Sequence, residues 1–388
     1  MIRYLIFVAV GVLWIGCSRS SVSNDDKWSI RMANTIMHRC DSLSNYSHEA
    51  HQWQYDIALL GLAIDQLGDE DARYSRYMER YIGSYVSTDG VVQGYDPEEF
   101  NIDRIRPAIN LIVLYKRTGQ ERFSKALNAF VGQMLQHPRT PSGLYWHKKI
   151  YPNQSWLDGA FMACPFLCQY AREFDQSQWF DEVTFQLCRM YQNHLDRTTG
   201  LLYHAVDESK QMAWADPKSG HSPHFWGRAM GWYMMALVDV LDFLPAHHPR
   251  RDEVVSILQS CARSVLTVRD LKSKCWFQVL DMGGQSGNYL EASCSSMFTY
   301  VFAKGANKGY LDETYLQFAR ESFEGIVKHL VRQDGDGYYS LQQICGACGL
   351  GGNPYRDGSY GYYVNEKVVD NDAKGLAPFI MAALELNL

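Results

Sequence analysis

Two tryptophans and an arginine stand close together in the segment 224–233, which reads His-Phe-Trp-Gly-Arg-Ala-Met-Gly-Trp-Tyr. Aromatic rings stack on the apolar face of a sugar, and a guanidinium binds a carboxylate through two parallel hydrogen bonds. A single tryptophan is more often a core residue than a ligand. Trp226, Arg228 and Trp232 together, following a loop rich in Pro and Gly at 216–223, favour a binding site for a sugar that carries a carboxylate.

Two aspartates stand where helices are expected to begin. Asp103 precedes Pro107, a residue suited to the first turn of a helix. Asp158 follows Ser155 with the Ser-x-x-Asp spacing of a capping box, and an acid in a first turn also complements the helix dipole. Taken alone, Asp158 is therefore better explained as a capping residue than as a catalytic acid.

Two histidines change that balance. His147 in Tyr-Trp-His and His204 in Leu-Tyr-His both adjoin loops and both have aromatic neighbours. One histidine alone is more often structural. Two carboxylates, two imidazoles and the tryptophan–arginine cluster, all beside predicted helix starts, indicate a site for proton transfer on a sugar.

The segment 226–232, followed by Ala-Leu-Val-Asp-Val-Leu at 236–241, resembles the signature of glycoside hydrolase family 105, the unsaturated rhamnogalacturonyl hydrolases and their relatives. The segment 156–163 resembles the part of that family that bears its catalytic aspartate, and 101–103 matches its second acidic position. The resemblance implies that Asp158 and Asp103 are catalytic. It also implies a set of sugar-binding residues, namely His147, His204, Trp226, Arg228 and Trp232.

Further segments at 287–293, 357–360 and 371–375 also look like parts of this family, so the resemblance covers nearly the whole chain. The departures are Ala-Met at 229–230 and the cysteine-containing loop 345–352. These departures bear on substrate preference more than on the fold.

The resemblance implies chemistry on sugars with a C4=C5 double bond, which polysaccharide lyases leave behind. Asp158 is expected to protonate C4 and afterwards to take a proton from the water that adds at C5. Asp103 is expected to help keep Asp158 protonated, because two close carboxylates resist double ionisation. Neither a metal nor an organic cofactor is expected to take part.

Three other functions fit the same residues. The closest is an unsaturated glucuronyl hydrolase of family 88 type, acting on ulvan or glycosaminoglycan fragments. The others are a non-catalytic glycan-binding lipoprotein, which has no use for an acid pair, and an (α/α)-barrel polysaccharide lyase, which creates the double bond instead of removing it. The net charge of −6 and the lack of basic runs exclude a nucleic-acid partner.

Apolar periodicity and turn residues predict helices throughout the chain and no long alternating strand. Short hairpin pieces fit 201–206 and 275–280. The helices are expected at 28–44, 50–68, 71–87, 104–117, 120–136, 156–172, 177–194, 225–244, 249–269, 290–305, 311–331 and 371–386. Six successive helical hairpins predict an all-α fold, an (α/α)6 barrel. A helical solenoid is the alternative, but the sequence has no fixed-period repeat.

The first 17 residues resemble a lipoprotein signal peptide, with Arg3, an apolar run at 4–15 too short to span a bilayer, and Gly before Cys17. We expect Cys17 to be lipidated, 18–27 to be a tether and 28–388 to be a single catalytic domain. The expected location is the bacterial cell envelope, where the lipid alone holds the protein to a membrane.

Nine further cysteines show no regular spacing. Most are expected to be small buried hydrophobic residues. Cys345 and Cys348 form the one Cys-x-x-Cys pair, which is weak grounds for a zinc site without a second pair. A disulfide between these two cysteines remains open.

Overall fold

The computed structural model describes residues 27–46 and 53–388, so Cys17 and nearly all of the predicted tether lie outside the described residues. Twelve long helices and one short one, α12 (Tyr360–Asn365), make up most of the described chain. The long helices are α1 (Trp28–Arg39), α2 (Tyr55–Asp65), α3 (Ala72–Tyr85), α4 (Ala108–Thr118), α5 (Glu121–Gln136), α6 (Leu157–Glu173), α7 (Gln178–His194), α8 (Gly227–Val240), α9 (Arg251–Thr267), α10 (Ala292–Asn307), α11 (Thr314–Leu330) and α13 (Ala373–Leu386).

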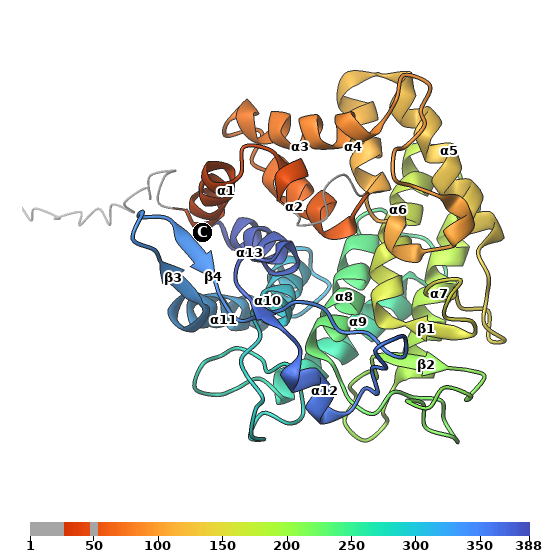
Figure 1. Ribbon diagram of the computed structural model, residues 1–388, viewed down its shortest axis with the longest axis vertical. Helices are drawn as coiled ribbons and strands as arrows, with labels where there is room; N and C mark the ends of the chain where they lie inside the picture. The colour runs from red at the N-terminus through yellow and green to blue at the C-terminus, as the bar shows by residue number, and fades with distance from the viewer. Residues whose placement is uncertain (1–26, 47–52) are drawn as a thin grey trace, which may run out of the picture.

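The long helices form two concentric layers (Figure 1). The inner helices α2, α4, α6, α8, α10 and α13 surround the middle of the molecule, and each packs mainly against one outer helix. α13 packs against both α10 and α2, which brings the last helix beside the first inner one. The backbone amide and hydroxyl of Ser29 donate to the carbonyl of Leu388, at 3.1 and 3.0 Å. This closure confirms the (α/α)6 barrel and rules out the solenoid.

Residue patterns explain which helix joins which layer. α8 is apolar nearly all round and buried at every position, as an inner helix must be. α3 instead buries one stripe, at Tyr74, Tyr77, Met78 and Tyr81, with the i, i+3, i+4, i+7 spacing of an amphipathic outer helix. A single large hydrophobic core, with members from α1 to α13, fills the space between the layers.

Every predicted long helix is present, and the predicted bounds err mainly at the ends. The predicted helix 225–244 is α8, which begins at Gly227 and ends at Val240. Gly227 has a packing reason: a Cβ there would lie 2.8 Å from the sulfur of Cys294 and 3.2 Å from the carbonyl of Phe277. The glycine therefore lets the start of α8 approach α10 closely.

The sequence did not predict α12 or the three two-stranded antiparallel sheets in the described chain. These are β1 (Gln154–Trp156) with β2 (Ala205–Asp207), β3 (Val331–Gln333) with β4 (Tyr339–Leu341), and β5 (Ile344–Cys345) with β6 (Val368–Val369). The predicted strand at 201–206 overlaps β2, whose partner is β1 and not an adjacent hairpin arm. The other predicted piece, 275–280, forms isolated bridges to Leu290 and Trp226.

No helix within the described residues is long and apolar enough to cross a membrane. In the same residues, no group of three or more His, Cys, Asp and Glu side chains is arranged to hold a metal ion. Seven of the cysteines are buried as small hydrophobic residues, which confirms the expectation for most of them. The sulfurs of Cys345 and Cys348 lie 3.4 Å apart, so the pair is in contact but not bonded.

Candidate active site

The predicted site residues come from the starts of inner helices and from the loops that precede them. Asp158 lies in the first turn of α6, Arg228 in the first turn of α8, and Asp103 in the 3-10 turn Ile102–Arg104 ahead of α4. The β1–β2 pairing sets Trp156 opposite Ala205, which brings the start of α6 beside His204. One end of the barrel therefore collects these side chains from segments that are far apart in sequence.

Asp158 does not belong to a capping box. The N-cap of α6 is Trp156, which makes no side-chain cap bond, and the Ser155 hydroxyl lies 3.0 Å from His194 Nε2. Oδ2 of Asp158 is buried without a hydrogen-bond partner and lies 3.6 Å from Nε2 of His204. Burial, and then the charge of Asp103, raise the pKa of Asp158 to about 7.

Asp103 is the ionised member of the pair. Burial acts to raise its pKa, but the charge of Lys148 is the largest of the effects that lower the pKa, and the net shift is downward. Lys148 Nζ lies 2.8 Å from Oδ2, and His147 Nε2 lies 3.4 Å from Oδ1. Burial lowers the pKa of His147 to about 4, so its contact with Asp103 at neutral pH is not an ion pair. The two aspartates therefore differ in charge: Asp103 is anionic while Asp158 holds its proton near neutrality.

Trp156 packs against both predicted site histidines and fixes their orientation. Its ring lies parallel to the His147 ring, with centroids 4.7 Å apart and planes 2° apart, and Tyr151 stacks on it at 5.0 Å. His204 meets Trp156 edge-on at 5.3 Å and lies 4.7 Å from Trp226. Stacked and edge-on rings fix side-chain orientation beyond what burial alone provides.

Arg228 is 1% exposed, and its guanidinium is already bound within the protein. It donates to the hydroxyl of Ser293 at 2.8 Å, to Glu291 at 3.3 Å, and to the carbonyls of Cys345 and Gly346. Burial acts to lower the pKa of Arg228, but Glu291 and other acidic neighbours raise it above its ordinary value, so the group is charged. The expected two-bond grip on a uronate carboxylate would therefore have to compete with these partners.

The two tryptophans differ in position. Trp226 is buried against His204 and lies beneath the guanidinium of Arg228, 5.4 Å from ring centroid to Cζ. Trp232 is fully buried, stacks on Phe161 at 4.7 Å and meets Tyr55 edge-on at 6.0 Å. Trp232 thus packs in the barrel interior, behind the wall that Tyr55 presents to the pocket. The structure brings the predicted site residues together at one end of the barrel, except Trp232. Trp232 contacts Phe161 and Tyr55 and reaches the site only through such rings.

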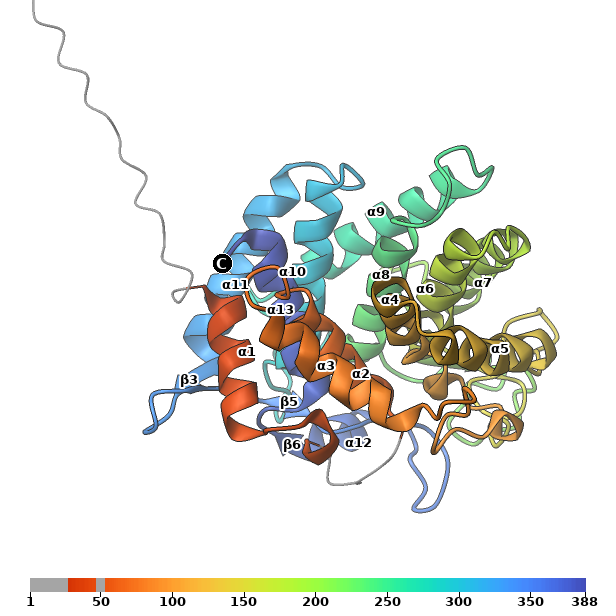
Figure 2. The ribbon, with the colours of Figure 1, turned by 90° about the horizontal axis from the view of Figure 1, so that it is seen from above.

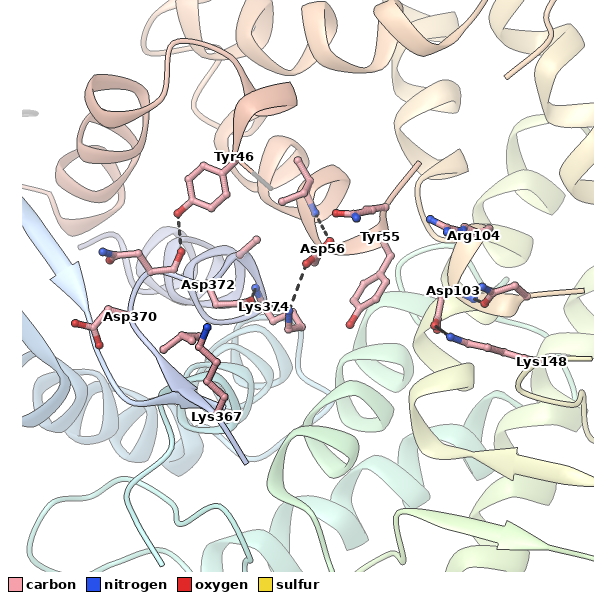
Figure 3. Close-up of a pocket in the computed structure, with 16 residues that line it drawn as sticks. Tyr46, Tyr55, Asp56, Asp103, Arg104, Lys148, Lys367, Asp370, Asp372 and Lys374 are labelled. Atoms are coloured by element: carbon pink, nitrogen blue, oxygen red, sulfur yellow. Dashed lines mark hydrogen bonds and ion pairs between the residues drawn. The ribbon is translucent and has the colours of Figure 1, made fainter. Parts of the chain in front are cut away.

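A pocket of about 500 Å³ opens at this end of the barrel (Figure 3). Asp103 and Lys148 lie on one side of it, Lys367 and Asp370 lie on the other, and Tyr55 stands between them. The size falls in the range of roughly 300–1,000 Å³ that is usual for ligand pockets. Of the predicted site residues, Asp103 alone lines this pocket. Three buried polar atoms of the other predicted residues have no hydrogen-bond partner in the described chain: Nδ1 of His147, Oδ2 of Asp158 and Nε2 of His204.

Sequence reasoning missed three residues of this site. Lys148 fixes the charge of Asp103, Glu291 balances Arg228, and the hydroxyl of Tyr363 lies 2.7 Å from Nδ1 of His204. Lys148 directly follows His147 in the sequence, so its place next to a predicted site residue could have identified it. Nothing in the sequence marks Tyr363, because α12 is too short to show periodicity.

The model of glycosyl hydrolase family 88 matches residues 28–387. A family 105 glycoside hydrolase of C. acetobutylicum ATCC 824 is 41% identical, covers 93% of this chain and 99% of its own, and superposes with a TM-score of 0.90. The chain is a glycoside hydrolase of the family 88 and 105 group. Its all-α barrel is the fold that this group shares.

Several curated relatives of this glycoside hydrolase bear functional names. The unsaturated rhamnogalacturonyl hydrolase YesR of Bacillus subtilis is 22% identical over 292 residues, which are 74% of this chain and 78% of that protein. An unsaturated 3S-rhamnoglycuronyl hydrolase of Formosa agariphila is 26% identical over 174 residues, 45% of this chain and 44% of that protein. The group to which the hydrolase belongs therefore acts on unsaturated glycuronyl sugars.

Replacing Arg228 with Lys separates a structural role of the arginine from a direct grip on substrate. Lysine can reach Glu291 but cannot also satisfy Ser293 and two carbonyls, so we expect the free energy of unfolding to fall by about 2–4 kcal/mol. Denaturant unfolding of the hydrolase measures this. Arg263→Lys, at an exposed arginine of α9, is the matched control and should stay within about 0.5 kcal/mol. Unchanged stability with a raised KM for charged sugars alone would instead show direct recognition.

Asp158→Asn should alter the dependence of stability on pH. The folded pKa of about 7 lies above the unfolded value of about 3.9, so the folded hydrolase holds a proton that the unfolded chain has released between these values. Wild-type stability therefore declines as pH rises through this window. We expect Asp158→Asn to gain about 1–3 kcal/mol over wild type at pH 8 relative to pH 4.5. A loss of stability that is equal at both pH values would restore the capping interpretation.

Proposed function

We propose that this glycoside hydrolase is an unsaturated rhamnogalacturonyl hydrolase that acts by hydrating the C4=C5 double bond of a terminal unsaturated uronate. The observation that supports the proposal most is the carboxyl of Asp158, whose Oδ2 is buried without a hydrogen-bond partner and which is protonated near neutral pH beside an ionised Asp103. Such a carboxyl is suited to give its proton to carbon and to take another from water. The similarity to YesR supports the choice of sugar.

The proposed reaction follows from these charges. The O–H of Asp158 gives its proton to C4, the double-bond electrons form the C4–H bond, and a positive charge develops at C5 and the ring oxygen. Water adds at C5, and the Asp158 carboxylate takes the released proton, so the acid is regenerated. The hemiketal then opens and releases the neighbouring sugar. The anionic Asp103 stabilises the cationic intermediate and maintains the raised pKa of Asp158.

A second candidate substrate has support of its own. The similarity to the unsaturated 3S-rhamnoglycuronyl hydrolase of Formosa agariphila favours the ulvan alternative. Both candidates place a rhamnose after the uronate, and both use the same proton transfers. Formation of the double bond removes the C4 configuration that distinguishes galacturonate from glucuronate, so C4 cannot provide selectivity between the two substrates.

Incubation with lyase-digested pectin, ulvan and chondroitin tests the proposal. We expect the ultraviolet absorbance of the double bond to fall fastest with pectin fragments. Asp158→Asn should lower kcat by about 10²-fold or more, which is the usual contribution of general acid–base catalysis. Asp181→Asn provides a matched control, because Asp181 also lies in a helical first turn but is exposed on the outer helix α7.

Heavy water gives an independent measure of the mechanism. Deuterium should appear at C4 of the released uronate product, and a product unlabelled at C4 would exclude the hydration. A rise of absorbance with intact polysaccharide would identify a lyase. Binding without any change in absorbance, unaffected by Asp158→Asn, would identify a glycan-binding protein.

We also propose that the enzyme is anchored in the bacterial envelope through a lipid on Cys17, on the strength of the Gly-Cys junction that follows the apolar run. Intact mass of the protein purified from its native membranes should show a chain that begins at Cys17 and carries acyl groups. Cys17→Ser should release the protein from the membrane fraction without loss of turnover. Unmodified mature protein from native cells would contradict the anchor.

A further inference from the structure

Within the described chain, the Tyr363 side chain forms one hydrogen bond, and its partner is the site residue His204. The tyrosine lies on α12, is fully buried, and places its hydroxyl 2.7 Å from Nδ1 of His204. The Tyr363 carbonyl accepts from Gln278 at 3.1 Å, and the same glutamine accepts from the indole of Trp226 at 3.1 Å. The tyrosine is thereby held against the start of α8.

Which group donates in the hydrogen bond between Tyr363 and His204 follows from which buried atoms would otherwise lack a partner. Burial lowers the pKa of His204 well below 6.5, so the ring is neutral and only one of its nitrogens carries hydrogen. Burial raises the pKa of Tyr363 well above 10, so its hydroxyl keeps its hydrogen. If Nδ1 donated to Tyr363, the tyrosine hydrogen would be buried with no acceptor, which is costly, whereas a hydrogen on Nε2 faces the Asp158 carboxyl 3.6 Å away. The hydroxyl therefore donates to Nδ1.

The other nitrogen faces the catalytic carboxyl. Nε2 of His204 has no hydrogen-bond partner and lies 3.6 Å from Oδ2 of Asp158, which also has none. With Nδ1 accepting from Tyr363, Nε2 must carry the hydrogen. In the opposite tautomer, a bare Nε2 would accept the acidic proton of Asp158 and hold it away from the substrate.

We propose that Tyr363 is a positioning residue: it fixes the tautomer of His204 so that Nε2–H points at Asp158 as a donor only. The donor leaves the Asp158 proton free for C4 and stabilises the carboxylate that remains after transfer. The catalytic consequence rests on the proposed function, but the tautomer itself does not. α12, which the sequence did not predict, thereby acquires a part in the reaction.

Other charged groups act on this pair and bear on its pH dependence. His147, His194 and Arg356 lower the pKa of His204 further, in addition to burial. Asp158 also responds to further groups on the elements packed around it, namely Asp103, Arg228 and Lys148. None of them forms a hydrogen bond with His204 in the described residues, so the tautomer depends on Tyr363.

Nitrogen-15 NMR of the histidine side chains in the whole enzyme measures the tautomer directly. We expect the His204 signals, assigned by their loss in His204→Gln, to show protonated Nε2 and unprotonated Nδ1. Protonated Nδ1 in the wild-type enzyme would overturn the proposal. This measurement needs neither substrate nor a variant at Tyr363, so it stands even if no unsaturated uronate proves to be cleaved.

Tyr363→Phe removes the hydroxyl and keeps the ring. We expect the two tautomers of His204 to mix, and kcat to fall about tenfold, the scale on which hydrogen-bond partners of reactive histidines act. KM should change less than kcat, because the tyrosine is fully buried behind His204.

The pH profile gives a readout that simple loss of packing would not move. Activity needs protonated Asp158 and declines as pH rises through its pKa of about 7. Without an obligatory donor at Nε2 the carboxylate is less stabilised, so in Tyr363→Phe this decline should move to higher pH. Tyr360→Phe, which removes a hydroxyl bonded to the Ser286 carbonyl at 3.0 Å on the same helix, should leave the tautomer and the profile unchanged. An unshifted profile with a uniform His204 tautomer in Tyr363→Phe would contradict the proposal.

Discussion

A carboxyl group remains protonated near neutral pH only where it is removed from water and receives no strong donor, and the site is arranged around that requirement. Asp158 stands at the start of a helix, where the dipole and free amides would favour its charged form. Burial and the anionic Asp103 outweigh that preference. Asp103 is also largely removed from water, yet Lys148 at 2.8 Å keeps it ionised. The two carboxyls differ in protonation because Lys148 contacts Asp103 and does not contact Asp158.

Arg228 holds the surrounding loops in place. Its partners lie 63 to 118 positions away along the chain, on the start of α10 and on the loop that follows β5. The guanidinium and Glu291 are almost fully removed from solvent, so each depends on the other for its charge to be tolerated. The same loop is tied to the segment before α13 by the β5–β6 pairing. The arrangement of the loops at this end of the barrel therefore depends on a buried ion pair.

The helices were predictable because each is long enough for its apolar spacing to stand out, and twelve in succession leave few architectures. The catalytic candidates Asp103 and Asp158 were found through their neighbours and a family resemblance. That Asp103 keeps Asp158 protonated was also expected, but the part of Lys148 and of burial in setting the two protonation states was not, because only the packed structure fixes it. α12 and the short strands were not predicted from the sequence for another reason. Segments of two to six residues carry no readable period, and their pairing partners lie far away in the chain.

The closure of the ring through α13 has a consequence for how this enzyme is made. α13 packs against α1, α2, α10 and α11, and Figure 2 shows the first and last helices lying together. Ribosomes deliver the chain from its N-terminus, so the apolar faces of α1 and α2 must wait for a partner that is synthesised last. The predicted catalytic and sugar-binding residues all precede α13, although Lys374 of α13 lines the pocket. A nascent chain can thus contain all the predicted catalytic residues before α13 has closed the barrel. During that interval the apolar faces of α1 and α2 are exposed, and the chain is prone to aggregate or to bind chaperones.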